Sequence, residues 1–356
     1  YLHKRQAVLD IFRTIAATTA LLDREGPSEI LTCAGPPLVA YVMHGVASRR
    51  GVRTPVLVSR STWWRRLVSL DANARMLTLS ALATPQRWRR ADAGPAGSVA
   101  AFVHRAFWRP GMTTGSAESY IGAILSELEK RAGRIRYIGV GPARNFRAHR
   151  RLDSAGDSAG AVVPIERFAP LPALRASRDV WRNRQRLYRT MTRSQALREA
   201  AVIEGVDCWP IVREELAGVA WLQWPWSVRA MDEAAAALDR CRPSVVVTYA
   251  EAGGWGRALI LEARRRGIPS AGLQHGFIYR HWLNYRHEPD ELEATGTPAF
   301  PYPTRTLLFD DYAARHLVEA GRLPATSLCV TGSPRLDELA ADIVALGDGA
   351  IRRVKS

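Results

Sequence analysis

The sequence predicts an α/β protein built on a parallel sheet with helices on both faces, and three observations support this fold class. Short apolar runs rich in β-branched residues recur along the chain, as at residues 244–249 and 327–331. Helical patterns separate these runs, so that strand, helix and strand alternate. Gly26, Gly267 and Gly321 each follow a helical pattern, as is usual where a helix ends. Connections of this kind between parallel strands are right-handed.

Length and composition are those of a globular protein. The 356 residues suffice for one large or two ordinary domains, with 47% hydrophobic and 24% charged residues. The formal charge is +16, but Arg dominates the basic residues, which are spread widely and show no nucleic-acid-binding signature. We therefore expect no nucleic acid, and an anionic partner of another kind, either a nucleotide-activated sugar or a phospholipid surface.

Localisation is inferred from several negative observations. No apolar run reaches membrane-spanning length, and no signal peptide is visible. Cys33, Cys208, Cys241 and Cys329 are far apart, without the spacing of a zinc site or a dense disulfide framework. These features predict a cytoplasmic protein, with peripheral contact at the inner face of the cell membrane as an open alternative. The first residue is Tyr1 rather than Met, which indicates a fragment or a processed chain.

The N-terminal region predicts a helix followed by a strand–helix–strand unit. Residues 1–25 have apolar positions at helical spacing, broadly on one face, and Gly26-Pro27 ends the pattern. The apolar residues of this face are Val8, Ile11, Phe12, Ile15, Leu21 and Leu22. We expect a strand over residues 29–33, a helix over 38–50 and a strand over 54–59, which together form a first βαβ unit of the sheet.

The middle region is expected to be largely helical. Residues 61–133 give an interrupted helical signal that includes a helix over 120–131. Residues 134–141 return to the sheet, with one further strand at 161–165. Residues 170–240 predict a helical insertion or lid, with an Arg-rich helix from about 173 to 199 and a second from about 228 to 241. Its Trp cluster at 221–226 either packs the insertion onto the sheet or, beside Arg, forms a platform for a sugar ring or a membrane interface.

The segment from 243 to 337 organises the prediction. A buried strand at 244–249 leads into Glu251-Ala-Gly-Gly-Trp-Gly256, whose glycines allow positive φ before a helix over 257–266. A second strand at 270–274 delivers His275-Gly276 at its carboxyl end, where ligands of parallel sheets bind. The polar and aromatic residues of 277–291 therefore predict an active-site loop.

Two more strands complete the pattern. The strand at 306–309 ends in Asp310-Asp311, a helix covers 312–320, and the strand at 327–331 ends in Gly332-Ser-Pro-Arg-Leu-Asp337. We expect a helix and a tail over roughly the last sixteen residues.

This ordered set of elements resembles the first, Rossmann-like lobe of GT-B glycosyltransferases of bacterial surface and capsular polysaccharide synthesis. The residues that carry the resemblance are Gln274-His275-Gly276, the aromatic-acidic loop and Thr331-Gly-Ser-Pro-Arg-Leu-Asp337. The pattern is also similar to CDP-glycerol glycerophosphotransferases and to non-hydrolysing UDP-N-acetylglucosamine 2-epimerases. It covers residues 240–340 well, and residues 28–60 only as a generic βαβ unit.

The resemblance implies one lobe over residues 1–335 with the insertion at about 170–240, followed by a linker or the start of a second lobe over 336–356. In GT-B proteins a second lobe holds most of the nucleotide donor, so we expect the chain to be truncated or to lack the donor half. Proteins of this kind usually work without a bound metal or other cofactor, and the nucleotide-activated donor is a substrate.

The candidate site residues follow from strand ends and from the resemblance. We expect His275, Glu251 and Glu288 to be catalytic, with His275 as the general base that removes a proton from an acceptor hydroxyl. Substrate binding is assigned to the remaining candidates: Gly253, Gly254, Gln274, Gly276, Tyr279, Arg280, Asp310, Gly332, Ser333 and Arg335.

Each assignment has a structural alternative. His275 can instead orient the loop through backbone hydrogen bonds, and Glu288, like Asp290 and Glu291, can lie on a solvated loop face. Arg335 can clamp a phosphate or pair with a nearby Asp. His275, His281 and His287 recur every six residues, a spacing that shares no face of a helix or strand, so no metal site is expected.

Three functions stay open at this point. The first is transfer of a sugar from a nucleotide-activated donor to a growing cell-surface polysaccharide or glycolipid, with glycerophosphate transfer as a close variant. The second is a 2-epimerase-like reaction on a nucleotide sugar. The third is a non-catalytic, single-lobe scaffold of a polysaccharide assembly complex.

Overall fold

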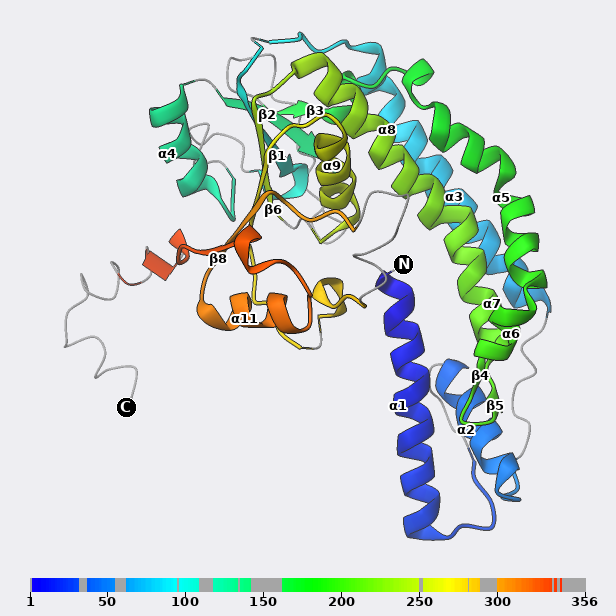
Figure 1. The fold of residues 1–356 in the computed structure, drawn as a ribbon. Coiled ribbons are helices and arrows are strands. Elements are labelled where there is room, and N and C mark those ends of the chain that lie inside the picture. The colour runs from blue at the N-terminus through cyan, green and yellow to red at the C-terminus, as the bar shows by residue number, and fades with distance from the viewer. Residues whose placement is uncertain are drawn as a thin grey trace, which may run out of the picture. The chain divides into compact units, whose positions relative to one another are not determined.

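The computed structural model describes residues 2–31, 37–54, 62–94, 96–108, 118–133, 135–141, 162–249, 252–280, 282–288, 300–334, 336–337 and 340 (Figure 1). They form two compact units. We call Tyr1–Ala81 with Ala176–Val228 the helical unit, and Leu82–Arg175 with Arg229–Ser356 the sheet unit. No helix within the described residues has both the length and the apolar character needed to cross a membrane.

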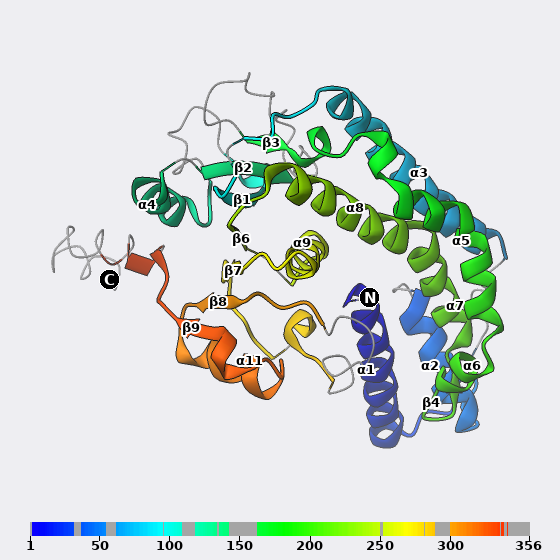
Figure 2. The same ribbon diagram turned by 45° about the horizontal axis from the view of Figure 1, so that its top comes forward.

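The sheet unit contains a parallel sheet of seven strands, which confirms the predicted α/β class. Its spatial order is β3-β2-β1-β6-β7-β8-β9, which Figure 2 shows from top to bottom. The strands are β1 (Val99–His104), β2 (Ile135–Val140), β3 (Val163–Pro164), β6 (Val245–Tyr249), β7 (Ser270–Leu273), β8 (Arg305–Leu308) and β9 (Leu328–Val330).

The order of the strands reverses at the centre of the sheet. From β1 the chain moves outward through β2 and β3, and it later returns to the other side of β1 to place β6 through β9. This is the doubly wound, Rossmann-like arrangement, in which ligands bind outside the carboxyl ends of the strands at the point of reversal. In this chain that point lies between β1 and β6.

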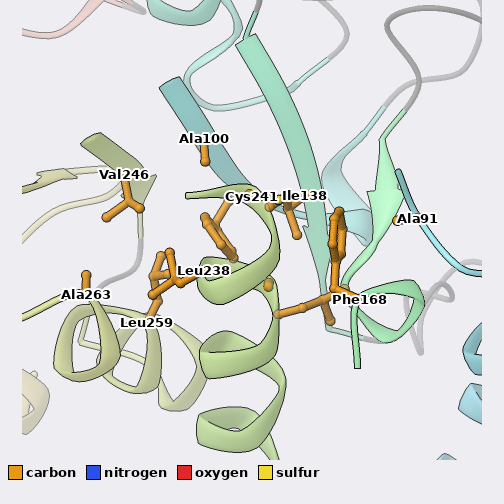
Figure 3. Packing of buried hydrophobic residues seen from close by; sticks show 12 residues of the cluster. Ala91, Ala100, Ile138, Phe168, Leu238, Cys241, Val246, Leu259 and Ala263 are labelled. Atoms are coloured by element: carbon orange, nitrogen blue, oxygen red, sulfur yellow. The ribbon is translucent and has the colours of Figure 1, made fainter. Parts of the chain in front are cut away.

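Alternating residues of the central strands enter two different cores, as the period of two in a strand requires. Ala100 and Phe102 of β1 and Val246 of β6 face the helices α8 (Trp224–Cys241) and α9 (Gly254–Arg265), where Leu238 and Leu259 contribute to the same cluster (Figure 3).

The opposite face of the sheet is covered by α4 (Gly122–Ala132). Ala101 and Val103 of β1 and Val247 of β6 lie in this second core together with Leu125 of α4. Both faces of the central strands are therefore buried, which explains the nearly continuous apolar sequence of β6.

The remaining elements are mostly helices and short turns. In the order of the chain they are α1 (Leu2–Glu25), α2 (Pro37–Arg49), α3 (Thr62–Trp88), α5 (Arg175–Arg193), α6 (Gln195–Ala200), the hairpin strands β4 (Val202–Ile203) and β5 (Val206–Asp207), α7 (Trp209–Gly218), a π-helical turn at Val219–Gln223, and α11 (Asp311–Glu319). Short 3₁₀ turns lie at Arg105–Phe107, Ile165–Arg167, Leu171–Ala173, Leu283–Tyr285 and Ala325–Ser327.

The predicted strand at 29–33 is not found in its described part, because residues 29–31 are not in the sheet and Glu29 makes an isolated bridge to Arg53. The rest of that strand and nearly all of the predicted strand at 54–59 lie outside the described residues. The predicted helices of this region are confirmed as α1 and α2. They pack on each other and on the β4–β5 hairpin, with Ile11, Val42 and Val206 in one core of the helical unit.

The helical prediction for residues 61–133 missed β1. The run Val99-Ala-Ala-Phe-Val-His104 is short, and its two alanines carry no β preference. The Arg-rich helix is also shorter than expected, because Ser194 ends α5 and caps α6 by accepting a hydrogen bond from the Leu197 amide.

The other predicted strands and helices of the sheet unit are confirmed, from β2 and α4 to β9. The helix after β6 begins at Gly254 rather than at residue 257, so Gly254 and Gly256 lie in its first turn. Of the apolar residues that define the predicted face of α1, Ile11, Ile15 and Leu22 are buried, whereas Val8, Phe12 and Leu21 are exposed.

Candidate active site

Three neighbouring strands bring polar and aromatic residues to the carboxyl edge of the sheet. β1 ends at His104, β6 ends at Tyr249, and β7 is followed directly by Gln274 and His275. Because these strands are parallel and adjacent, their ends meet at one edge, beside the point where the strand order reverses.

His275 is surrounded by aromatic side chains. The centroids of the Tyr249, Tyr120 and Trp282 rings lie 5.6, 5.7 and 6.0 Å from that of the imidazole. The histidine is half-buried, and its Nδ1 atom is buried without a hydrogen-bond partner among the described residues. Aromatic rings beside a polar group form the type of surface on which a ligand with both apolar and hydroxyl faces can rest.

The environment of His275 determines its protonation. Burial lowers the pKa of its imidazole below the ordinary value, since desolvation disfavours the charged form. The ring is therefore neutral at neutral pH and retains one nitrogen lone pair that can accept a proton. This state is the one that a general base requires.

Gln274 fixes the backbone around His275. Its side chain is buried, its Nε2 donates to the Gly276 carbonyl at 2.8 Å, and its Oε1 accepts from the Phe309 amide at 2.8 Å. Both ends of the amide are thus engaged with the backbone, so the predicted substrate-binding residue Gln274 positions the loop that carries His275.

Arg257 holds the same loop from α9. Its guanidinium donates to the carbonyls of Ala252, at 2.9 Å, and Asn284, at 2.6 Å, and it lies 4.0 Å from the centroid of the Phe300 ring. These contacts link the start of α9 to the 3₁₀ turn that follows Trp282.

A buried carboxyl group lies close to this aromatic cluster. Glu118 is 3% exposed, and its Oε2 accepts hydrogen bonds from the amides of Tyr120, at 2.7 Å, and Ile121, at 2.6 Å. Burial raises the pKa of Glu118, although these two amides oppose the shift. Oε1 is buried and, among the described residues, meets no partner at hydrogen-bonding geometry.

Tyr249 connects Glu118 to the end of β1. Its hydroxyl oxygen accepts a hydrogen bond from the His104 amide at 2.9 Å. Burial raises the pKa of Tyr249, and the Glu118 carboxylate adds to the shift, so the phenol stays protonated. The end of β1 is itself packed closely, because a Cβ at Gly141, where φ is +77°, would lie 2.4 Å from His104 Nε2.

The other predicted substrate-binding residues have identifiable contacts. Asp310 is the N-cap of α11, and its Oδ1 accepts from the Ala313 amide at 2.7 Å. Ser333 is buried, and its carbonyl accepts from the amides of Leu336 and Asp337. Gly332 adopts a φ of +80°, whereas Gly276 does not have positive φ, and a Cβ there would meet nothing within 4 Å.

The positive φ expected for the glycines before α9 is wrong. Gly253 is the N-cap residue with a φ of −80°, and Gly254 and Gly256 are helical. The helix N-terminus is present, but it needs no left-handed backbone at these positions.

The predicted loop residues are partly exposed. Tyr279 is 48% exposed and its ring lies 6.5 Å from that of Trp282, while Arg280 and Glu288 are on the surface. The predicted residues Glu251 and Arg335 lie outside the described residues, as do His281, Asp290 and Glu291. Among the predicted site residues, the rings of both His275 and Tyr279 lie near that of Trp282, with centroid distances of 6.0 and 6.5 Å.

Sequence reasoning missed four residues around His275. Tyr249 had a usable signal, because it is the last residue of a predicted strand and therefore lies at the same edge as His275. Trp282 lies within the predicted loop but carried no assigned role. Tyr120 and Glu118 offered no local signal, since their position depends on β1.

Comparison of the chain with protein-family models, with curated proteins and with solved structures gave no match.

Proposed function

We propose that this protein is a metal-independent glycosyltransferase that moves a sugar from a nucleotide-activated donor to a growing cell-surface polysaccharide or glycolipid. The resemblance of residues 240–340 to GT-B first lobes motivates the proposal. The strand order supports it, because sheets of this kind bind nucleotide-containing ligands where the order reverses, which in this chain is between β1 and β6. In this proposal the protein works in the cytoplasm, at or near the membrane that carries its acceptor.

The observation that carries the proposal is the state of His275. The neutral imidazole lies among three aromatic rings at the carboxyl edge of the sheet, and its buried Nδ1 has no hydrogen-bond partner within the described part of the chain. Sugar rings pack their C–H faces on aromatic side chains, and their hydroxyl groups supply the proton that a neutral imidazole can accept.

His275 takes the proton from the acceptor hydroxyl, and the acceptor oxygen forms a bond to the anomeric carbon of the donor. The bond between that carbon and the donor phosphate breaks, and the nucleotide leaves with the electron pair. Gln274 and Arg257 hold the loop in place during these steps, which preserves the alignment that the transfer needs.

The test is nucleotide release from a panel of uridine, guanosine and cytidine diphosphate sugars, with saccharide and glycolipid acceptors. We expect His275→Ala to lower turnover several hundred-fold, within the roughly 10²–10⁴-fold range of general base catalysis. His316→Ala is the matched control, because His316 is also half-buried, its pKa is also lowered by burial, and it lies on α11.

Three results would contradict the proposal or its mechanism. Equal turnover in His275→Ala and His316→Ala removes His275 from the chemistry. Product that is isomerised in the absence of any acceptor indicates an epimerase. If the protein neither releases nucleotide nor binds a saccharide with any member of the panel, it is not a transferase, and a scaffold becomes the better explanation.

A further inference from the structure

The helix α5 carries a row of exposed arginines along one side. Seven of its 19 residues are Arg, and Asp179 is its only acidic residue. Five of the arginines recur at intervals of three or four residues, which places them on one face of a helix. We call these five the arginine row: Arg178, Arg182, Arg186, Arg189 and Arg193.

All five arginines of the row are exposed. None of their guanidinium groups makes an ion pair or hydrogen bond to another described residue. Arg184, on another side of the same helix, differs: it lies 3.9 Å from the Trp181 ring centroid and donates to the Trp181 carbonyl. Within the part of the chain that the structure describes, the five guanidinium groups of the row are therefore cations without side-chain partners.

The geometry of the row is linear. From Arg178 to Arg193 the helix rises roughly 22 Å, at about 1.5 Å per residue. No Gly or Pro interrupts α5, so nothing in its sequence bends the row. A ligand that contacts every member must present negative charge along a straight line of that length.

The aromatic residues of α5 are directed to other contacts. Tyr188 packs edge-on against Trp221, with the ring centroids 4.9 Å apart, and Trp181 is covered by Arg184. Single-stranded nucleic acid is usually bound by exposed aromatic side chains that stack on bases, and this helix presents none beside its row. The phosphates of a duplex follow a helical path, which a straight row meets at only a few points.

We infer that the arginine row is a docking site for a membrane surface rich in anionic phospholipid. A flat layer of phosphate headgroups can contact all five guanidinium groups at once, and Arg binds phosphate with paired hydrogen bonds. The contact is electrostatic, without insertion, because the large apolar and aromatic side chains of α5 are half-buried within the protein. The inference does not depend on the proposed transferase activity.

The experiment is co-sedimentation of the full chain with vesicles of phosphatidylcholine containing about 30% phosphatidylglycerol, and with pure phosphatidylcholine. The row variant combines Arg182→Gln, Arg186→Gln and Arg189→Gln. Each Arg near an anionic surface contributes about fivefold to binding, so partitioning of the row variant should fall roughly a hundredfold. Wild-type binding should also weaken steeply as salt rises from about 0.1 to 0.5 M.

A matched control separates the row from the overall charge of +16. Arg89, Arg90 and Arg315 are exposed arginines elsewhere, and their combined change to Gln removes the same three charges. This control variant should bind vesicles as the wild type does. Since Arg and Gln have similar helix propensities, α5 should persist in the row variant, which circular dichroism checks.

Three outcomes overturn the inference. One is wild-type protein that does not bind the anionic vesicles. The second is an equal loss in the row and control variants, which assigns binding to net charge alone. The third is a row variant that keeps vesicle binding but loses binding to a single-stranded oligonucleotide, which makes the row a nucleic-acid site.

Discussion

Arg87 and Arg229 in the sheet unit differ from the arginine row in both burial and partners. Their side chains are 2% and 4% exposed, and both donate to Oε1 of Glu233, whose side chain is fully buried. Arg87 also donates to the Ala169 carbonyl at 2.6 Å. On α5, the arginines of the row face solvent and contact no carboxylate of the described chain.

The comparison shows how one residue type serves two purposes. A guanidinium taken out of water must have its charge balanced inside the protein, because the desolvation penalty is several kcal/mol, on the order of magnitude of the whole stability. An exposed guanidinium needs no such partner and adds little to stability. Its charge stays available to an external ligand.

The largest expected effect concerns Glu233. Glu233→Ala removes the buried carboxylate to which Arg87 and Arg229 both donate, so we expect a loss of about 3–5 kcal/mol in the free energy of unfolding, measured by urea denaturation. The row variant should change the same quantity by less than about 0.5 kcal/mol, because surface substitutions usually do.

A triple variant separates charge from shape at this site. Arg87→Met, Glu233→Leu and Arg229→Met together should recover most of the stability that Glu233→Ala loses, since apolar residues of similar size need no partner. If Glu233→Ala instead unfolds at the same urea concentration as the wild type, the cluster is not structurally important and the comparison fails.

The second expected effect concerns Gln274, whose side-chain amide is buried like Glu233 but carries no charge. Gln274→Ala leaves the Phe309 amide and the Gly276 carbonyl without their side-chain partner, at a cost of about 2 kcal/mol. Turnover should fall with it, because the loop bearing His275 is released. Gln195→Ala is the control, because Gln195 is exposed and its side chain donates to Glu199 on the same short helix, α6. Equal losses in the two variants would contradict a positioning role for Gln274.

The third and smallest effect is a dependence on pH. The pKa of His275 is lowered in the folded state, so below about 6.5 the unfolded chain binds a proton that the folded chain does not. Stability should therefore fall as the pH drops below about 6.5, by at most about 1.4 kcal/mol per pH unit from this residue.

Urea denaturation at pH 7.5 and 5.5 measures this effect, and His275→Gln should reduce the difference. The raised pKa of Glu118 acts in the opposite direction, because its contribution to the stability of the folded protein is lost as the pH rises. Glu118 is present in both the wild type and His275→Gln, so the difference between the two proteins reports His275 alone. The row variant should keep the wild-type pH dependence, since Arg does not titrate in this range. An unchanged pH dependence in His275→Gln would show that the imidazole is not desolvated.

The sheet could be predicted from sequence where a strand was rich in β-branched residues, as in β6, or was bounded by Gly and Pro, as in β7, which follows Gly267 and Pro269 and precedes Gly276. β1 was missed although it contains Val99 and Val103, because its two alanines weaken the strand pattern. Residues 29–33 were predicted as a strand instead, because the patterns before residue 60 are similar to those of a βαβ unit. Local pattern cannot show that α2 packs on α1 and the β4–β5 hairpin rather than on the sheet.

In the candidate site, the residue at a strand end could be predicted from sequence, but its tertiary neighbours could not. His275 follows a well-marked strand, and its place at the carboxyl edge required only the rule for parallel sheets. Its neighbour Tyr120 is brought there by α4 and β1, over a long stretch of chain, so no local pattern could reveal the aromatic enclosure. The burial that lowers the pKa of the imidazole is likewise a tertiary property.

The pairing of β1 with β6 also affects how the chain folds as it is synthesised. The Thr248 hydroxyl donates to the Phe102 carbonyl across 146 residues, and the residues between them include β2, β3 and much of the helical unit. Closing so long a loop is slow, since contacts distant in sequence carry a large entropic barrier. Until β6 leaves the ribosome, at roughly 5–20 residues per second, β1 has a free edge for several seconds, and this interval is when the nascent chain is most exposed to aggregation.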